Sequence, residues 1–207
     1  MVVAGYSTMK SVVFQFQLLA GNPVLDFANT LDYRFDPRRT IELMSSYERL
    51  VDFAQQSGLI TENQARRLKS LKNERAAERA LRHAIQLREV IESVFRALLA
   101  RMAPNKSSVE DLNRFLARAR EHQTFHWKSG RLTQCFDDLE RNAESPTWLL
   151  AVSAEALLTS PELAHVRACH EPSCRWLFLD HSKNHSRRWC AMELCGNRAK
   201  VRKFRKQ

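Results

Sequence analysis

Glycine and proline are scarce in this chain, which has 5 Gly and 6 Pro among 207 residues. So low a content excludes a collagen-like or loop-rich chain and favours helices. Because 44% of the residues are hydrophobic and 27% are charged, a chain of this length can bury a core, which excludes disorder throughout. The length indicates one domain, or one domain with a small additional module.

Long apolar runs are also missing. No stretch of about 18 apolar residues occurs, so we expect no transmembrane helix and no membrane partner. Residues 11–21 are moderately apolar, but Gln15 and Gln17 interrupt them and no small-residue cleavage pattern follows. This pattern argues against a secretion signal, and we expect a cytoplasmic protein.

The sequence lacks the motifs of several common enzyme classes. It contains no glycine-rich phosphate loop, no His-Glu metalloprotease helix and no nucleophile elbow. Glu89 and Glu92 lie together on a predicted helix, but such carboxylates usually belong to a solvated face. We therefore expect that the chain is not an enzyme, and a reaction carried out in the helical domain is the weaker alternative.

Hydrophobic periodicity predicts a mostly helical domain over residues 14–160, after a loose N-terminus over residues 1–13. The alternation of Phe14–Leu18 predicts a short strand, and Ser129-Gly130 predicts a hairpin over residues 124–136. No internal repeat or heptad series occurs. The predicted helices span residues 24–31 after the cap Asn22-Pro23, 43–56, 61–71 from a Thr61/Gln64 capping box, 76–102, 107–121 from a Ser107/Glu110 box, and 147–159.

The net charge of +10 is concentrated at the C-terminal end. Residues 181–207 hold nine cations and a single anion, Glu193, which leaves a net charge of only +2 for residues 1–180. A basic segment of this kind suggests a polyanionic partner, although a C-terminal run of charge is often merely solvated.

Four of the five cysteines fall within 27 residues, as Cys169-x4-Cys174 and Cys190-x4-Cys195. Two such pairs supply the four soft ligands of a tetrahedral zinc ion, each pair from one tight turn. Two disulfides or four unrelated thiols are the alternatives, but disulfides are rare in a reducing cytosol. We therefore expect one structural Zn²⁺ at these four cysteines, with a closed shell that leaves no position for a catalytic water.

The segment around these cysteines predicts a treble-clef-like zinc finger at the C-terminal end of the chain. A strand and turn over residues 175–184 follow the first pair, and a helix over residues 197–206 begins after Cys195. The predicted fold class is α+β, mainly α: a helical N-terminal domain with a small β element, followed by the finger. Apolar side chains are expected to form a small core around the metal, namely Trp176, Leu177, Phe178, Trp189 and Phe204.

The residues of this segment resemble a known family. The chain carries the signature Cys195-Gly196-Asn197-Arg198, preceded by the run Phe178-x-Asp180-x-Ser182-x-Asn184 and by Ser186-Arg187-Arg188-Trp189-Cys190, and is similar to the CGNR zinc finger over residues 165–207. Residues 21–30 resemble the opening motif of the ABATE domain, with Ala28 where a larger apolar residue is usual. Such fingers usually follow an ABATE domain, which is described as a stress-induced transcription regulator of bacteria. The resemblance implies a bacterial DNA-binding transcription regulator.

The C-terminal cations are the candidate DNA contacts, because cations on phosphates supply most of the affinity for nucleic acid. Arg198, Arg202 and Arg205 share one face of the predicted helix, and Asn197 or Arg198 is expected nearest to base edges. RNA or protein is the alternative partner of a zinc module of this kind. The full candidate set is Arg187, Arg188, Asn197, Arg198, Lys200, Arg202, Lys203, Arg205 and Lys206.

A polar cluster in the N-terminal domain is the candidate ligand pocket. Asp26, Asn29 and Thr30 fall within about one helical turn, and Arg88 lies close to the apolar stripe of the long helix. A helical domain of this size suggests a sensor, a dimerisation domain or both, so a small-molecule effector and a second copy join DNA as expected partners. A buried ion pair between Asp26 and Arg88 is the structural alternative.

Overall fold

The computed structural model of the chain describes residues 14–205, so the loose terminus predicted over residues 1–13 and the candidate contact Lys206 lie outside the described residues. The fold class, α+β and mainly α, is confirmed. The helices are α1 (Pro23–Ala28), α2 (Tyr47–Gln56), α3 (Glu62–Lys69), α4 (Glu74–Leu99), α5 (Lys106–Arg120), α6 (Ser145–Leu158) and α7 (Asn197–Phe204). The strands are β1 (Leu31–Asp32), β2 (Ile41–Glu42), β3 (Gln123–Lys128), β4 (Arg131–Phe136), β5 (Val166–Ala168) and β6 (Leu177–Leu179).

The helices begin largely at the predicted caps. Asn22 accepts a hydrogen bond from the Val24 N–H, and Thr61 forms the predicted capping box with Gln64. The prediction of Ser107 as the cap of α5 is wrong. Asn105 is the cap, because its side chain accepts from both the backbone N–H and the hydroxyl of Ser107, which places the Ser107 residue inside the helix.

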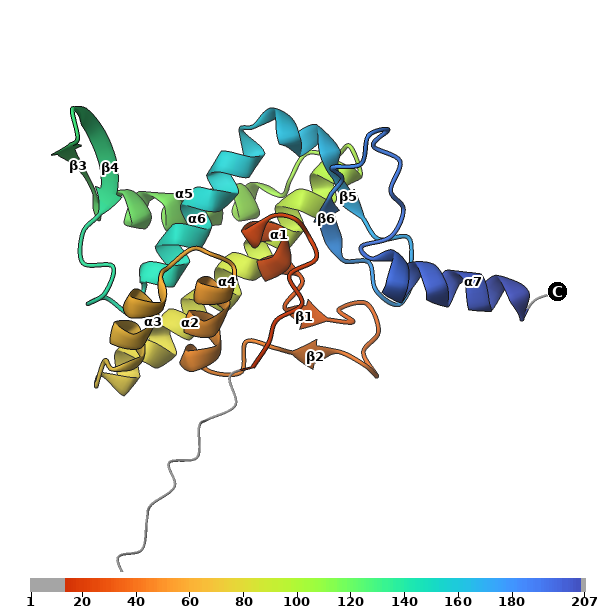
Figure 1. The fold of residues 1–207 in the computed structure, drawn as a ribbon, viewed down its shortest axis with the longest axis horizontal. Helices are drawn as coiled ribbons and strands as arrows, with labels where there is room; N and C mark the ends of the chain where they lie inside the picture. Colours follow the sequence, from red (N-terminus) through yellow and green to blue (C-terminus); the bar gives the residue numbers. More distant parts are fainter. Residues whose placement is uncertain (1–13, 206–207) are drawn as a thin grey trace, which may run out of the picture.

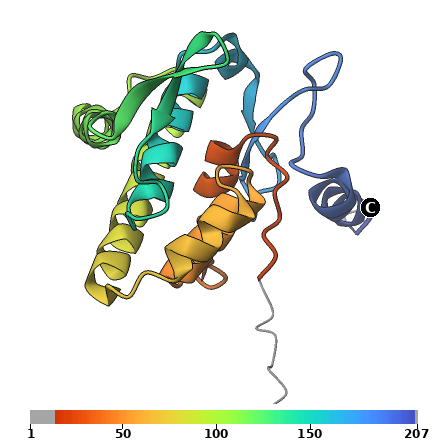
Figure 2. The same cartoon turned by 60° about the vertical axis from the view of Figure 1, so that its left-hand side comes forward.

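Helices α1 to α6 form one body around α4, which contacts α1, α2, α5 and α6. Figure 1 shows this body with the β3–β4 hairpin projecting from one end and α7 from the opposite end, and Figure 2 shows α7 apart from the other helices in a second view. One cluster of buried side chains runs through α1, α2, α4 and α6 and continues into β5, β6 and the four clustered cysteines. The C-terminal segment therefore shares the core of the helical domain.

Each sheet has two antiparallel strands: β1 with β2, β3 with β4, and β5 with β6. The hairpin predicted over residues 124–136 is confirmed as β3–β4. The strand predicted over Phe14–Leu18 is wrong, since these residues pair with no strand. The Gln56 side chain takes the place of a partner strand, donating to the Phe14 carbonyl over 2.6 Å and accepting from the Phe16 N–H over 2.9 Å.

Arg88 is a buried cation on α4, with 2% of its surface exposed. Its guanidinium donates to both carboxylate oxygens of Glu42 over 2.6 and 2.7 Å, and to Glu89 over 2.9 Å. The alternative ion pair between Asp26 and Arg88 is therefore wrong. The pair with Glu42 joins α4 to β2. Removing one partner from a buried pair of this kind would leave the other charge uncompensated.

The described part of the chain contains no helix that is both long enough and apolar enough to span a lipid bilayer.

Candidate metal centre and nucleic-acid interface

The four clustered cysteines lie together in the structure. Their sulfur atoms are within 4.8 Å of one another, and all four residues are buried. The Cys190 sulfur lies 3.7 Å from that of Cys174 and 3.6 Å from that of Cys195. Sulfurs at the corners of a tetrahedron with Zn–S bonds of about 2.3 Å are separated by about 3.8 Å. The spacing thus fits four ligands around one ion.

The four cysteines lie in two turns of the backbone, one between β5 and β6 and one before α7. Cys169 follows β5, and the Cys174 N–H closes its turn by donating to the Glu171 carbonyl over 2.9 Å. Cys195 lies in a wide turn over Met192–Gly196 that leads directly into α7. A Cβ at Gly196 would overlap the end of the Met192 side chain, so a larger residue here would displace that exposed side chain. The first cysteine pair thus lies in the turn that joins β5 to β6, and the second pair leads into α7.

Packing four thiols together changes their acidity. Hydrogen bonds with Cys174 and Cys190 lower the pKa of the Cys169 thiol, while hydrogen bonding to Cys169 raises the pKa values of Cys174 and Cys190. Thiolates this close repel one another, and a divalent cation between them removes the penalty while deprotonating the thiols that bind it. The cluster therefore fits one structural zinc ion.

The finger is fastened to the helical domain by its strand β6. The side-chain amide of Asn29 donates to the Leu177 carbonyl over 2.9 Å, and its carbonyl oxygen accepts from the Leu177 N–H over 2.8 Å. The Leu179 N–H donates to the Ala20 carbonyl over 2.7 Å, and the Trp176 indole N–H donates to Asp32 over 2.9 Å. These bonds make the finger a continuation of the helical body.

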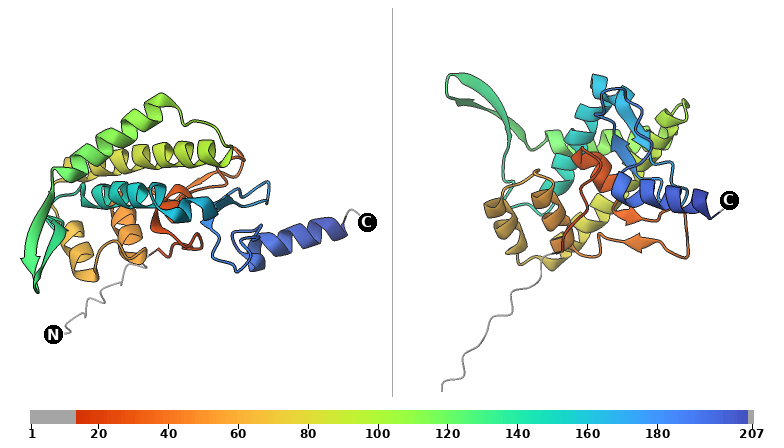
Figure 3. Two further views of the ribbon diagram at one scale, coloured as in Figure 1. Left: turned by 90° about the horizontal axis from the view of Figure 1, so that it is seen from above. Right: turned by 45° about the vertical axis from the view of Figure 1, so that its right-hand side comes forward.

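The separate core predicted around the metal is only partly correct. Leu177 and Phe178 are fully buried, but they belong to the cluster that also contains Leu25 and Phe27 of α1. Phe204 is 79% exposed, so the prediction that it joins a core around the metal is wrong. The reason is that α7 projects away from the body, as Figure 3 shows, which leaves the Phe204 side chain largely in solvent.

Two of the candidate DNA contacts are engaged within the finger. The Arg187 guanidinium lies 4.7 Å from the centre of the Phe178 ring and donates to the carbonyls of Trp189 and Cys190. Arg202 forms a two-point ion pair with the buried carboxylate of Glu171. Both side chains hold the finger together, which limits their reach toward a partner.

Most of the other candidate contacts are exposed. Lys200, Lys203 and Arg205 have no ion pair or hydrogen bond from their side chains to any described residue. Arg198 is exposed and borders a small cavity together with Tyr33. Two further candidates make local contacts: Asn197 donates to the Glu193 carbonyl at the base of α7, and Arg188 lies beside Trp189 and His170.

Glu171 was not foreseen as part of the finger. It lies between Cys169 and Cys174 and is buried, and hydrogen bonds from Arg202 keep its pKa below the ordinary value against the opposing effect of burial. The available signal was an acidic residue inside a cysteine turn that precedes a basic helix. Such a signal is common on solvated turns, and only the fold shows that Arg202 lies opposite Glu171.

Three of the four candidate pocket residues border one cavity. Asp26, Asn29 and Thr30 line a cavity of about 270 Å³, together with Trp176 of the finger. Arg88 does not border it, although its guanidinium donates to the Thr30 hydroxyl over 3.3 Å. The structure thus places a ligand-sized space where α1 meets the finger.

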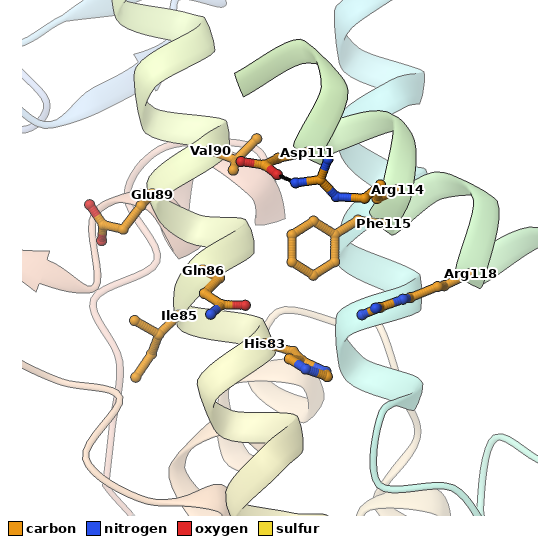
Figure 4. A pocket seen from close by; sticks show the side chains of 9 residues that line it. All are labelled: His83, Ile85, Gln86, Glu89, Val90, Asp111, Arg114, Phe115 and Arg118. Carbon is orange, nitrogen blue, oxygen red and sulfur yellow. Dashed lines mark ion pairs between the residues drawn. The ribbon is translucent and has the colours of Figure 1, made fainter. Parts of the chain in front are cut away.

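A second cavity, of about 500 Å³, lies between α4 and α5 and was not foreseen. Figure 4 shows Phe115 at its centre with the His83 and Arg118 side chains directed toward the same space, while Arg114 is paired with Asp111. His83 is in turn bonded to Glu144 over 2.8 Å. Because acidic and basic side chains both line this cavity, its lining favours no single charge on a ligand.

Asp26 gives a pH-dependent prediction. Burial raises the pKa of its carboxyl from 3.8 to about 6, although the backbone N–H groups of Ala20 and Leu19 oppose the shift. The folded chain therefore holds this proton more tightly than the unfolded chain, so the contribution of Asp26 to the free energy of unfolding falls as pH rises from about 4 to about 6. The decrease is on the order of 3 kcal/mol.

We expect Asp26→Asn to become more stable relative to the parent chain over that interval, because the asparagine oxygen still accepts from Ala20. Urea unfolding of both chains at a series of pH values measures the difference. A difference in the free energy of unfolding that does not change with pH would contradict the assignment.

Two family models match the chain. The ABATE model, described as "Putative stress-induced transcription regulator", matches residues 21–161, and the CGNR zinc finger model matches residues 165–207. Because the first of these spans more than half of the chain, the chain belongs to the ABATE family and carries a CGNR zinc finger at its C-terminal end. No curated protein gives a match.

Proposed function

We propose that this ABATE-family chain is a bacterial DNA-binding transcription regulator. One observation carries the proposal: four buried sulfurs at the spacing of a zinc site lie at the base of α7, a projecting helix with exposed cations. A metal held by Cys169, Cys174, Cys190 and Cys195 folds the turn that precedes this helix. The metal is structural, since four thiolates close its shell.

The cations of the finger divide into two roles under this proposal. Arg187 and Arg202 are positioning residues, because they bond to the finger itself. Lys200, Lys203 and Arg205 contact phosphates, and Arg188 and Lys206 are further candidates for such contacts. Asn197 and Arg198, at the start of α7, lie where a helix entering a groove first meets base edges.

The helical domain over residues 14–160 acts as a sensor or dimerisation domain, and the finger over residues 165–207 as the DNA-binding part. The bonds from Asn29 to Leu177 support this division of labour, since they connect α1 directly to β6, the strand that lies between the two cysteine pairs. Two-fold dimers that match palindromic sites are common among DNA regulators, and a dimer is part of this proposal.

Salt dependence of DNA affinity tests the proposal. The variant Lys200→Ala/Lys203→Ala/Arg205→Ala should bind duplex DNA more weakly than the parent chain. The slope of log affinity against log salt should also become shallower by about 0.9 for each phosphate that the variant no longer neutralises. Fluorescence anisotropy with a labelled duplex from about 50 to about 300 mM salt measures both quantities.

A matched control removes the same charge elsewhere. Arg66→Ala/Lys72→Ala/Arg75→Ala replaces three exposed cations of the α3–α4 region and should leave the slope close to that of the parent. An RNA duplex of the same sequence gives the comparison between nucleic acids. Equal slopes for the two triple variants would mean that α7 does not contact phosphates.

A further inference from the structure

The cavity between α1 and the finger has an acidic and aromatic lining. Asp26 and Asp32 are the charged residues that border it, and Phe14, Phe16, Phe53 and Trp176 contribute aromatic rings. No described cation borders this cavity of about 270 Å³. Carboxylates beside aromatic faces are the surroundings that favour an organic cation, because both attract positive charge.

Asp26 is a buried carboxylate without a cationic partner. It is 7% exposed, and its side chain accepts from the Ala20 N–H over 2.9 Å, but no described cation forms an ion pair with it. Buried ionised groups are normally paired with an opposite charge. Arg88 and Glu171 follow this rule, since each has a charged partner, whereas Asp26 does not.

Asp32 connects this cavity with the metal centre. Its carboxylate accepts from the Trp176 indole N–H, and Trp176 lies two residues after Cys174. Asp32 and Trp176 also border a smaller cavity of about 120 Å³, which extends to Cys195 and Arg198 at the base of α7. A ligand beside Asp32 therefore contacts the same indole that joins the helical domain to the finger.

We propose that the cavity lined by Asp26, Asp32 and Trp176 binds a small organic cation, a primary amine or guanidine that carries an apolar group. The ammonium or guanidinium donates to the two carboxylates, and the apolar group packs among the phenylalanine rings. This proposal deepens the sensor role given above and rests on the proposed function for its regulatory meaning.

Benzylamine is the probe for this site, with benzyl alcohol and benzoate as probes of similar shape that are neutral and negatively charged. The zinc-loaded full chain, labelled with ¹⁵N, is titrated with each compound, and the indole N–H signal of Trp176 is followed after assignment with Trp176→Phe. Benzylamine should shift this signal saturably, and benzyl alcohol and benzoate should bind at least about tenfold more weakly.

Two variants remove charge and keep shape. Asp26→Asn and Asp32→Asn retain an oxygen that accepts from Ala20 and from Trp176, and each should weaken benzylamine binding at least about tenfold. Glu62→Gln, which makes the same change at an exposed position on α3, should bind like the parent. The comparison of the three probes on the parent chain needs no variant, so it holds even where a substitution prevents folding.

Equal binding of benzylamine and benzyl alcohol, no saturable shift with benzylamine, or unchanged benzylamine binding in folded Asp26→Asn and Asp32→Asn chains would each overturn the proposal. Its failure is distinguishable from failure of the proposed function. Loss of the benzylamine response with intact binding of DNA discards the cavity assignment alone. An intact response in a chain that does not bind DNA discards the proposed function alone.

Discussion

A chain in which serine replaces Cys190 will lose its zinc and bind DNA more than about 100-fold more weakly, because metal binding supplies the folding free energy of such fingers. Its free energy of unfolding will fall by more than about 4 kcal/mol, a loss typical of a metal site that is removed. At about 2–4 °C per kcal/mol for a chain of this size, the melting temperature drops by about 8 °C or more.

The effect should reach beyond the finger. Cys190 belongs to the cluster of buried side chains that also holds Leu25 and Phe27, and β6 is bonded to Asn29 of the helical domain. When the metal no longer holds the hairpin, the contacts that β6 makes with α1 weaken as well. Calorimetry should therefore show one destabilised transition for the whole chain.

Zinc content and melting temperature are measured together, by metal analysis of the purified chain and by calorimetry. Cys135→Ser is the matched control, since Cys135 is a half-buried thiol on β4 outside the cluster. It should retain one zinc ion per chain and bind DNA like the parent. Full zinc content in the Cys190→Ser chain would contradict the four-ligand assignment.

Replacing Asn29 with alanine should lower the free energy of unfolding by about 2–6 kcal/mol. The substitution leaves both the N–H and the carbonyl of Leu177 buried without their hydrogen-bond partner, at a cost of about 1–3 kcal/mol for each group. Because Leu177 lies between the two cysteine pairs, the same change loosens the finger and should weaken DNA binding.

Urea unfolding measures the stability, and hydrogen exchange at the Leu177 amide reports the contact itself. Asn113→Ala on the exposed face of α5 is the control, and its effect should stay within about 0.5 kcal/mol. A change for Asn29→Ala as small as that of the control would show that β6 is held by packing alone.

Local features of the fold could be predicted from local sequence. Periodicity and the Thr61/Gln64 box located α2 to α6 to within a few residues, since these signals arise within a single element. Two local predictions were wrong, one because another residue is the helix cap and one because a side chain takes the place of a partner strand. Asn105 capped α5 ahead of Ser107, and Gln56 took the place of a strand beside Phe14–Leu18.

The joining of finger and helical domain could not be predicted in this way. Asn29 and Leu177 are 148 residues apart, and no local sequence pattern indicates that the two residues are in contact. The ion pairs of Arg88 with Glu42 and of Arg202 with Glu171 are likewise set by tertiary packing. The cysteine cluster could be predicted, because the number and spacing of the four cysteines are themselves the signature of a zinc site.

The structure also divides the cations of the C-terminal segment into two groups. Arg187 and Arg202 are engaged in holding the finger, whereas Lys200, Lys203 and Arg205 are exposed along α7. The sequence placed all of these cations in one candidate set, because internal and outward arginines look alike until their partners are known.

Capture of genomic DNA fragments tests the central claim most directly. The zinc-loaded chain, the Cys190→Ser chain and the Cys135→Ser chain are each incubated with the same fragment pool, and the bound fragments are sequenced. We predict that the parent and Cys135→Ser chains recover the same enriched set, and that Cys190→Ser recovers none of it above background. Equal recovery by all three chains would contradict a zinc-folded finger as the DNA-binding element.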